Sequence, residues 1–482
     1  MRMLLVAAAA SLLLISAPPL TSAGFFRLPP KIGLSPAGSQ QFGKTLKDFA
    51  RKHGDEVADV VQNLLPPPPP PGEGGSDDPG RIDNAPAETT GLYLASLLVG
   101  TPEPQTISGI LDISTQLVWM QCATCPPACP TPPSFYFQTT YSKTLNFLSC
   151  TNDAHYDCQS LIPQQCGPRN LCNYYTSYSK NTVTTGSLAS DAFTFDDGAT
   201  AVRLVFGCSN AMSTKGDYSG ASGVIGLGRG PLSLVSQLQL SNFSYLLAPY
   251  GDSGSQSQVQ LGGVAVPQKG RIRSTPLHAS AKYSNLYYVQ LTGIHVDGEE
   301  LHGIPPGTFE MNDDGSGGVF LSTTVAVTYL LSDAYKVVRE AFASKISQTS
   351  LESGIFDPLC YTAESMDGVT YPRLTLVFQG NDATMELRAQ NYFLKFNDGE
   401  RDLDCLSILP SQGASILGSL LQTGTTMIYD LNPDGEQLTF VTPEDASPSS
   451  PSPSQAPLGI PEARAASLPM VMAAAMWALL LL

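Results

Sequence analysis

Two segments of the chain share a pattern in which an apolar strand runs into a short hydroxyl-rich turn and out again as a second strand. They are Thr106–Trp119 and Gly318–Tyr329. Each is followed further along the chain by an apolar-apolar-glycine strand end, Val224-Ile225-Gly226 in one case and Ile416-Leu417-Gly418 in the other. Short apolar runs closed by turn residues predict buried strands. We interpret the repeat as two similar lobes.

The first turn carries an ionisable side chain, Asp112, within the sequence Asp112-Ile113-Ser114-Thr115. A carboxyl group at a strand end can exchange protons with a substrate or a water when a second acid faces it. It can equally hydrogen-bond the backbone of its own turn and do no chemistry. The corresponding second turn, Ser322-Thr323-Thr324-Val325, has hydroxyl groups and no carboxylate.

The chain from Gly91 to Val441 consists of short β-type runs closed by Gly, Pro, Asn or Asp. The 482 residues include 43 Gly and 39 Pro, and only 14% are charged, which suits a turn-rich β protein better than a helical bundle. The longest helical pattern runs from Ser332 to Ser347, where Ser332 can cap the helix. We therefore expect an all-β fold with a few short helices.

The N-terminal end resembles a processed leader. Residues 1–23 combine a basic start, an apolar stretch and small residues up to Ala23, the pattern of a secretory signal peptide. Residues 24–90 include the proline run Pro66–Pro71 and predict an extended propeptide or spacer outside the core.

The C-terminal end predicts a lipid anchor. Residues 468–482 are apolar without a break but too short to span a bilayer comfortably, and a Ser/Pro-rich spacer, 446–467, precedes them. This order is expected of a GPI attachment signal whose tail is removed. A tail-anchored or soluble protein is the alternative. We expect a protein of the secretory pathway at the extracellular face of the plasma membrane through a GPI lipid, or a secreted one.

An oxidising compartment would pair the ten cysteines as disulfides. The spacing at residues 122–129 could also suit zinc, but no histidine lies near it. Each half of the chain has an even number of cysteines and can close its own bridges. The second half holds Cys360 and Cys405, and the eight others, whose pairing the spacing does not fix, are Cys122, Cys125, Cys129, Cys150, Cys158, Cys166, Cys172 and Cys208.

The formal net charge is −16 and the isoelectric point is near 4.7. Binding a phosphate backbone needs clustered Lys and Arg, so nucleic acid is excluded as a partner. The sequence has no nucleotide-binding loop and no histidine-based metal set. We therefore expect no cofactor.

Longer motifs point to one protein family. They include Phe206-Gly207-Cys208, the stretch from Gly223 to Leu234, Gly100-Thr101-Pro102 and Ser415-Ile416-Leu417-Gly418. From Gly91 to about Val441 the chain resembles the nepenthesin-like branch of plant pepsin-type aspartic proteases, and its tail resembles that of GPI-anchored members. The resemblance implies a two-lobed pepsin-like β fold, with an N-terminal lobe at 91–250, a C-terminal lobe at 251–445 and a substrate cleft between them.

The family's chemistry needs one aspartate from each lobe. The ionised one takes a proton from the attacking water, and the protonated one donates to the peptide carbonyl. The resemblance places the first at Asp112 and the second at Ser322, whose hydroxyl is too weak an acid to titrate in its place. Ile113 replaces a hydroxyl that braces the turn, and Ser114 and Thr324 replace glycines. The catalytic pair is therefore predicted to be degenerate.

Three further positions follow from the resemblance or from local motifs. Tyr178 falls at the flap position that covers substrate, although the segment after it lacks the family's glycines. Cys360 and Cys405 are predicted to pair within the second lobe. Asn242 begins the sequon Asn242-Phe243-Ser244, which is either glycosylated or an unused site on a partly buried strand.

Two functions remain open. The first is an extracellular homologue of aspartic-type endopeptidases whose own catalysis is weak or absent. The alternative is a non-catalytic binding or inhibitor protein resembling the cereal xylanase inhibitors. In both cases we expect a monomer that holds a polypeptide substrate, or a peptide or enzyme ligand, in the inter-lobe cleft.

Overall fold

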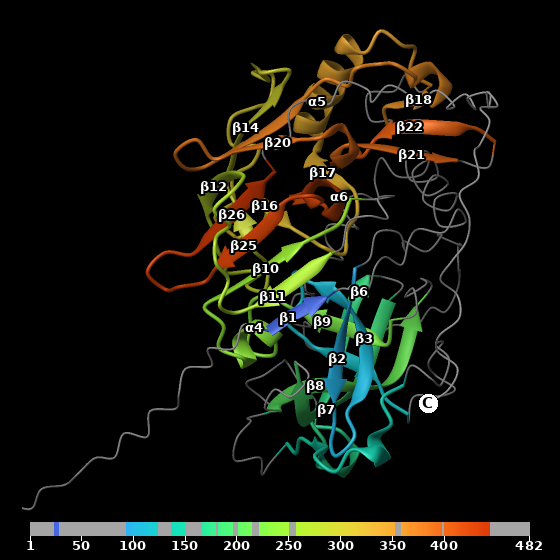
Figure 1. Cartoon of the computed structure of the whole chain (residues 1–482), viewed down its shortest axis with the longest axis vertical. Helices are drawn as coiled ribbons and strands as arrows, with labels where there is room; N and C mark the ends of the chain where they lie inside the picture. The colour runs from blue at the N-terminus through green and yellow to red at the C-terminus, as the bar shows by residue number, and fades with distance from the viewer. Residues whose placement is uncertain are drawn as a thin grey trace, which may run out of the picture. The chain divides into compact units, whose positions relative to one another are not determined.

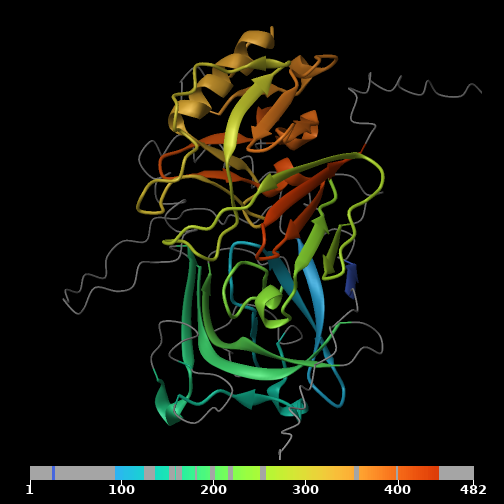
Figure 2. The ribbon, with the colours of Figure 1, turned by 90° about the vertical axis from the view of Figure 1, so that its left-hand side faces the viewer.

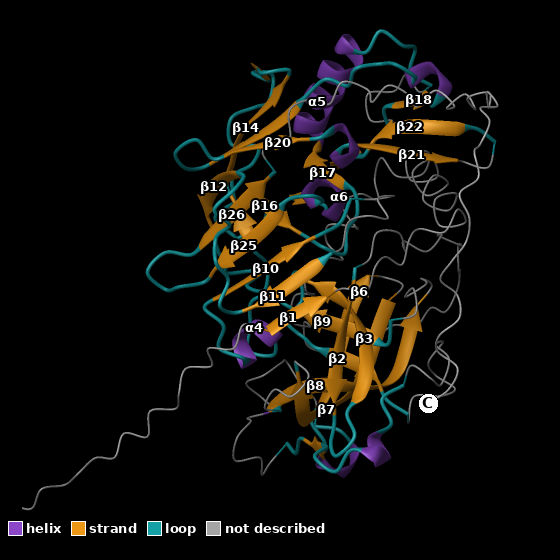
Figure 3. Cartoon of the chain, viewed as in Figure 1, coloured by secondary structure: helices purple, strands orange, loops and turns teal. Residues whose placement is uncertain are grey.

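The computed structural model describes residues 24–27, 93–123, 136–150, 158, 166–179, 182–195, 201–214, 221–249, 257–351, 358–397 and 400–443. The expected signal peptide, nearly all of the expected spacer, Cys125, Cys129 and both C-terminal segments lie outside these residues. Within the described residues strands predominate and most helices are short (Figure 3). The predicted all-β class is confirmed.

The first lobe is built on an eight-stranded sheet with the order β2-β3-β9-β4-β8-β7-β5, in which β6 also pairs with β7. The strands are Leu94–Val99 (β2), Gln105–Asp112 (β3), Trp119–Gln121 (β4), Asn146–Phe147 (β5), Asn173–Ser179 (β6), Thr182–Thr194 (β7), Val202–Thr214 (β8) and Gly223–Gly226 (β9). Figure 2 shows the long β7 and β8 as strongly bent green ribbons. At the middle of the sheet, β9 lies parallel to β3 and antiparallel to β4.

The second lobe repeats this central arrangement. Its five-stranded sheet has the order β13-β16-β24-β17-β23. The strands are Tyr288–Val289 (β13), Val319–Leu321 (β16), Thr328–Leu331 (β17), Ile408–Ser411 (β23) and Ser415–Leu417 (β24). Here β24 lies parallel to β16 and antiparallel to β17, so β16, β24 and β17 correspond to β3, β9 and β4. Each expected turn therefore starts at the end of a central strand.

Two smaller sheets complete the second lobe, and short helices lie in both lobes. One sheet joins Glu299–Glu300 (β15), Leu291–Val296 (β14), Leu374–Phe378 (β19) and Thr384–Leu387 (β20), and the other joins Cys360–Thr362 (β18), Asp402–Leu406 (β22) and Phe393–Asn397 (β21). In Figure 1 these sheets lie on either side of the helix α5, Ser332–Lys345. The short helices are Leu234–Gln237 (α4), Ser419–Gln422 (α6) and the 3₁₀ turns Thr139–Tyr141, Pro168–Asn170, Glu364–Met366 and Ala389–Asn391.

A six-stranded sheet brings together strands from both halves of the sequence. Its order is Gly24–Arg27 (β1), Gln258–Leu261 (β11), Asn242–Leu246 (β10), Thr426–Asp430 (β25), Gln437–Thr442 (β26) and Arg271–Pro276 (β12). The strand β1 differs from the expectation that residues 24–90 stay outside the fold, because it pairs antiparallel with β11. The edge of β11 presents backbone groups that a short extended segment can satisfy.

The helix α5 spans Ser332–Lys345, and one detail of its start differs from the prediction. Ser332 is the first helical residue and does not cap the helix; Leu331 holds that position, with no side-chain cap. The Ser332 hydroxyl donates instead to the Ser411 carbonyl oxygen, 2.9 Å away. The reason is that β17 ends at Leu331 and runs directly into the helix, which leaves no loop residue for a cap. Ala334, Val338 and Phe342 are buried and share one face of the helix.

Four disulfides lie among the described residues. Cys122–Cys208, Cys150–Cys166 and Cys158–Cys172 close the first lobe. Cys360–Cys405 joins β18 to β22, and these are the two residues that the sequence assigned to a second-lobe bridge. No described cysteine is free.

Candidate active site

The first turn starts where β3 ends. Asp112 pairs with Gly226 of the parallel strand β9, and Leu227 N–H donates to the Asp112 carbonyl oxygen at 2.8 Å. A Cβ atom on Gly226 would lie 2.7 Å from the Leu117 carbonyl oxygen, so only glycine allows this approach. The apolar-apolar-glycine motif therefore fixes the position of the carboxylate.

The second turn starts in the same way after β16. Leu321 pairs with Leu417 of β24, and Ser322 N–H donates to the Leu417 carbonyl oxygen at 3.1 Å. A Cβ atom on Gly418 would lie only 2.2 Å from the Val327 carbonyl oxygen. Ser322 thus occupies the position in the second lobe that Asp112 occupies in the first.

Side-chain oxygens of the two turns meet directly. Ser114 N–H donates to Asp112 Oδ1 at 2.7 Å, and the Ser114 hydroxyl donates to Ser322 Oγ at 3.2 Å. Ser322 Oγ also accepts from Thr324 N–H at 3.3 Å and Val325 N–H at 3.2 Å. The structure therefore brings Asp112 and Ser322 into one buried cluster, in which Ser114 links them.

Thr323 makes a cross-lobe brace that the sequence analysis missed. Its hydroxyl donates to the Leu111 carbonyl oxygen at 2.7 Å and accepts from Ile113 N–H at 3.2 Å. Ile113 has no hydroxyl to return these bonds and is fully buried instead. One half of a reciprocal brace is thus retained. A hydroxyl at the second position of the turn was the sequence signal that could have revealed it.

A glutamine of α6 holds the backbone of the second turn through hydrogen bonds. Gln422 Nε2 donates to the carbonyl oxygens of Ser322 and Leu417, at 2.9 and 2.8 Å. Its Oε1 accepts from the hydroxyl of Tyr245, which lies on β10 of the six-stranded sheet. The backbone of the second turn is therefore held firmly although its acid is missing.

Burial dominates the electrostatics of Asp112. The side chain is 3% exposed, and loss of solvation raises its pKa to about 6. Hydrogen bonds from the Ser114 backbone and side chain oppose this rise without cancelling it. The site thus holds one carboxyl group, which is ionised near neutral pH, and hydroxyl groups where a second acid would be needed.

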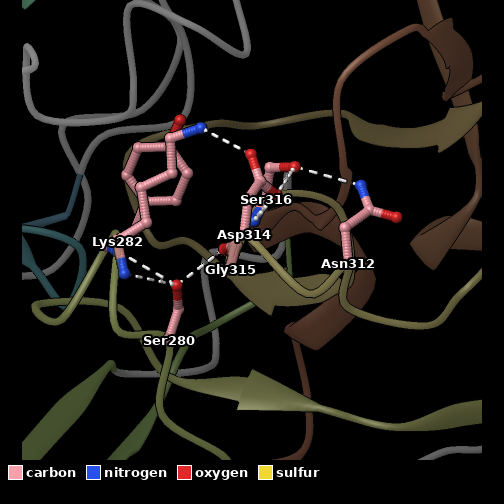
Figure 4. Close-up of polar contacts among 7 residues, drawn as sticks. Ser280, Lys282, Asn312, Asp314, Gly315 and Ser316 are labelled. Atoms are coloured by element: carbon pink, nitrogen blue, oxygen red, sulfur yellow. Dashed lines mark hydrogen bonds and ion pairs between the residues drawn. The ribbon is translucent and has the colours of Figure 1, made fainter.

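The other acids near the second turn are held elsewhere. Asp314 is 59% exposed, and Figure 4 shows it bonded to Ser316 and paired with Lys282 at 3.0 Å. The Ser316 hydroxyl, then Ser316 N–H and Lys282, lower the pKa of Asp314. Asp333 lies exposed in the first turn of α5. Neither acid belongs to the cluster around Ser322.

Two further predicted positions lie on strands β6 and β10. Tyr178 belongs to β6, at an irregularity in the pairing with β7 between Ser177 and Ser179, and its side chain lies outside the described residues. Asn242 lies half-buried on β10, and its Oδ1 accepts from Val264 N–H at 3.1 Å. The proposed flap and glycosylation roles of these residues stay predictions.

Two families match consecutive parts of the chain. The family described as "Xylanase inhibitor N-terminal" matches residues 93–263, and "Xylanase inhibitor C-terminal" matches residues 286–441. Aspartic proteinase nepenthesin-2 of Nepenthes gracilis is 36% identical over 348 residues, which cover 71% of this chain and 75% of that protein. The chain belongs to the plant family of pepsin-type aspartic proteases. Nepenthesin-1 of the same plant is 32% identical, over 73% of this chain and 78% of its own.

Solved structures share the fold at lower identity. The "edgp" structure has a TM-score of 0.57 and 20% identity, covering 73% of this chain and 92% of its own. Basic 7S globulin from soybean has a TM-score of 0.57 and 19% identity, covering 74% and 92%. At this identity the likeness establishes the two-lobed pepsin-like fold and nothing about activity.

Among the described residues, no group of three or more His, Cys, Asp or Glu side chains could hold a metal ion. None of the helices described is both long and apolar enough to cross a bilayer.

Proposed function

We propose that this protein is an extracellular, GPI-anchored homologue of aspartic endopeptidases whose own proteolytic activity is weak or absent. The observation that carries the proposal is the position of Ser322, which pairs through the Ser114 hydroxyl with the turn of Asp112 at 3.2 Å. A serine hydroxyl neither ionises nor protonates a leaving group in the pH range of a carboxyl pair. One carboxyl group then has to act as both base and acid.

Ser114 strengthens this proposal. Its hydroxyl lies against both Ser322 and the carboxyl group of Asp112, where a glycine would leave space. A water that attacks a peptide bond would have to compete with this hydroxyl for the same hydrogen bonds. The loss of the second acid and the filling of the space between the turns therefore act in the same direction.

Calorimetric titration of the purified protein with pepstatin at acidic pH tests the proposal. A lobe pair with an intact carboxyl pair binds this inhibitor tightly, whereas we expect no tight binding here. A tight, stoichiometric titration would contradict the proposal.

A binding or inhibitor function is the second candidate. It is favoured by the two xylanase inhibitor families that together match most of residues 93–441. Such a function needs the two lobes and their surfaces but no catalytic pair. Assays of xylanase activity with and without the protein test it, and inhibition that survives Asp112→Asn would support binding without catalysis.

A further inference from the structure

The backbone of the first turn is held from both lobes. Within the first lobe, the N–H groups of residues 227–228 donate to the carbonyl oxygens of Asp112 and Thr115, both at 2.8 Å. The carbonyl oxygen of Ser114, between them in the chain, accepts instead from Asn285 Nδ2 of the second lobe. Asn285 is half-buried and stands shortly before β13. A side chain of the second lobe therefore takes part in the hydrogen bonding of the first turn.

Asn285 is fixed by contacts to both lobes. Its carbonyl oxygen accepts from Arg229 N–H of the first lobe at 2.9 Å. A Cβ atom on Gly228 would lie 2.8 Å from the same oxygen, so glycine there allows this approach. Two residues after Asn285, the Tyr287 carbonyl oxygen accepts from Leu321 N–H at 3.2 Å, and Leu321 ends β16 directly before the second turn. Asn285 therefore connects the start of the second turn to the middle of the first.

Ser114 is the residue through which Asn285 reaches the acid. Ser114 N–H donates to Asp112 Oδ1 at 2.7 Å, and the Ser114 hydroxyl donates to Ser322 Oγ at 3.2 Å. The bond from Asn285 restrains the backbone that carries both donors. Without it the backbone of Ser114 is free to rotate, and both bonds weaken. We propose that Asn285 is a positioning residue that holds Ser114 and, through it, the carboxyl group of Asp112.

The loss of one bracing hydroxyl makes this second contact important. Ile113 has no hydroxyl to donate across the lobes, so Thr323 alone holds its N–H, at 3.2 Å. Asn285 holds the next residue, Ser114, from another segment of the second lobe. This inference concerns the site of the proposed function but not its activity, so its test needs no cleavage assay.

Few ionisable groups surround the first turn within the described residues. The turn 322–325 has none. In the segments that meet beside Asn285, Arg229 is paired with Glu436, and burial raises the pKa of Tyr287, which keeps it neutral. Burial raises the pKa of Asp112, and the bonds from Ser114 oppose that rise. The titration of Asp112 therefore reports on how firmly Ser114 is held.

Two NMR measurements on the purified full chain test the role of Asn285. Asn285→Leu keeps a similar size but removes the amide donor. Hydrogen exchange of Ser114 N–H should become about tenfold faster than in the wild type. The carboxyl carbon of Asp112 should titrate at a higher pH, because the bonds that lower its pKa weaken. Asn285→Ala should give the same two changes, so the result does not depend on how leucine fits.

Tyr287→Phe is the matched control. It removes the hydroxyl that donates across the lobes to the Leu227 carbonyl oxygen at 2.9 Å, and it leaves the bond between Asn285 and Ser114 in place. Its Tm should fall about as much as that of Asn285→Leu, with Ser114 exchange and Asp112 titration as in the wild type. The proposal is overturned if both Asn285 variants exchange and titrate as the wild type does, or if Tyr287→Phe changes both readouts equally. Neither result depends on whether the protein cleaves peptides, which pepstatin titration tests separately.

Discussion

At the scale of single residues, the site differs from a working carboxyl pair by more than one substitution. Ser322 removes an acid, Ser114 fills the space between the turns, and Ile113 removes one of two bracing hydroxyls. Asp112 is buried, and burial raises its pKa to about 6. Ionising this carboxyl group in the fold therefore costs free energy, and no second acid shares the proton. The remaining carboxyl group therefore acts on stability in a measurable way.

The first prediction concerns Asp112→Asn. Asp112 ionises near 3.8 in the unfolded chain and near 6 in the fold, so its proton favours the folded state. Its contribution is complete at pH values below 3.8 and is lost as the pH rises through 6. At about 1.4 kcal/mol per unit, the loss reaches about 3 kcal/mol. Urea unfolding should show the variant more stable than wild type at neutral pH, with the difference shrinking toward pH 4.

The control for this measurement is Asp314→Asn. Asp314 is exposed and its pKa is lowered, so the linkage has the opposite sign and its contribution is lost as the pH falls. This variant should not gain stability at neutral pH. If Asp112→Asn were less stable than the wild type at neutral pH, this would contradict the prediction that the buried Asp112 carboxylate destabilises the fold.

The second prediction concerns repair of the pair. Ser322→Asp alone should recover little activity, because the other turn positions still misplace the acids, and a displacement of about 1 Å can cost on the order of a hundredfold. Adding Ile113→Thr, Ser114→Gly and Thr324→Gly restores Asp-Thr-Gly in both turns. The fourfold variant should then cleave unfolded protein at acidic pH in a pepstatin-sensitive way. Equal activity of the single and fourfold variants would show that turn geometry does not matter here.

At the scale of elements, the two turns are held in place by strand ends and by one retained hydroxyl. Gly226 at the end of β9 and Gly418 just before α6 allow the backbones to approach closely. The Thr323 hydroxyl bonds across to the first turn. The backbone of both turns is therefore held in place although Ser322 stands where a second acid would be needed.

The third prediction tests the retained brace. Thr323→Val leaves Ile113 N–H and the Leu111 carbonyl oxygen unpaired in a buried place, and the free energy of unfolding should fall by roughly 1–3 kcal/mol. Thr324→Val is the matched control, since the Thr324 hydroxyl bonds only within its own turn, to Ser322. Chemical denaturation of both variants measures the difference. Equal losses for the two variants would rule out a special role for Thr323.

The sequence predicted the turns well because strong local constraints define them. Apolar strands and glycines without room for a Cβ marked where Asp112 and Ser322 would lie. The contacts that cross between lobes, such as Ser114 to Ser322, were not predictable, since no local pattern records which hydroxyls meet. The strand β1 was missed for a similar reason: a four-residue segment carries no period, and only the edge of β11 makes it a strand.

At the scale of the whole molecule, polar contacts link the two halves around the turns. Arg229 pairs with Glu436 and lies 4.8 Å from the centre of the Tyr287 ring. The Tyr287 hydroxyl donates to the Leu227 carbonyl oxygen at 2.9 Å, and Asn285 Nδ2 donates to the Ser114 carbonyl oxygen. These contacts join the two lobes beside the turns.

The fourth prediction concerns the proposed anchor. If residues 468–482 are a GPI signal, phosphatidylinositol-specific phospholipase C should release the protein from the cell surface. Deletion of the tail should send it to the medium. Membrane association that persists after the lipase would indicate a tail anchor instead.

We have proposed that Ser322 leaves the protein without an efficient catalytic pair. The most direct measurement is cleavage of an unfolded protein substrate by the unmodified protein at acidic pH, with and without pepstatin. We expect no pepstatin-sensitive cleavage above background. Robust cleavage that pepstatin abolishes would contradict this proposal and would mean that another acid, not Ser322, faces Asp112.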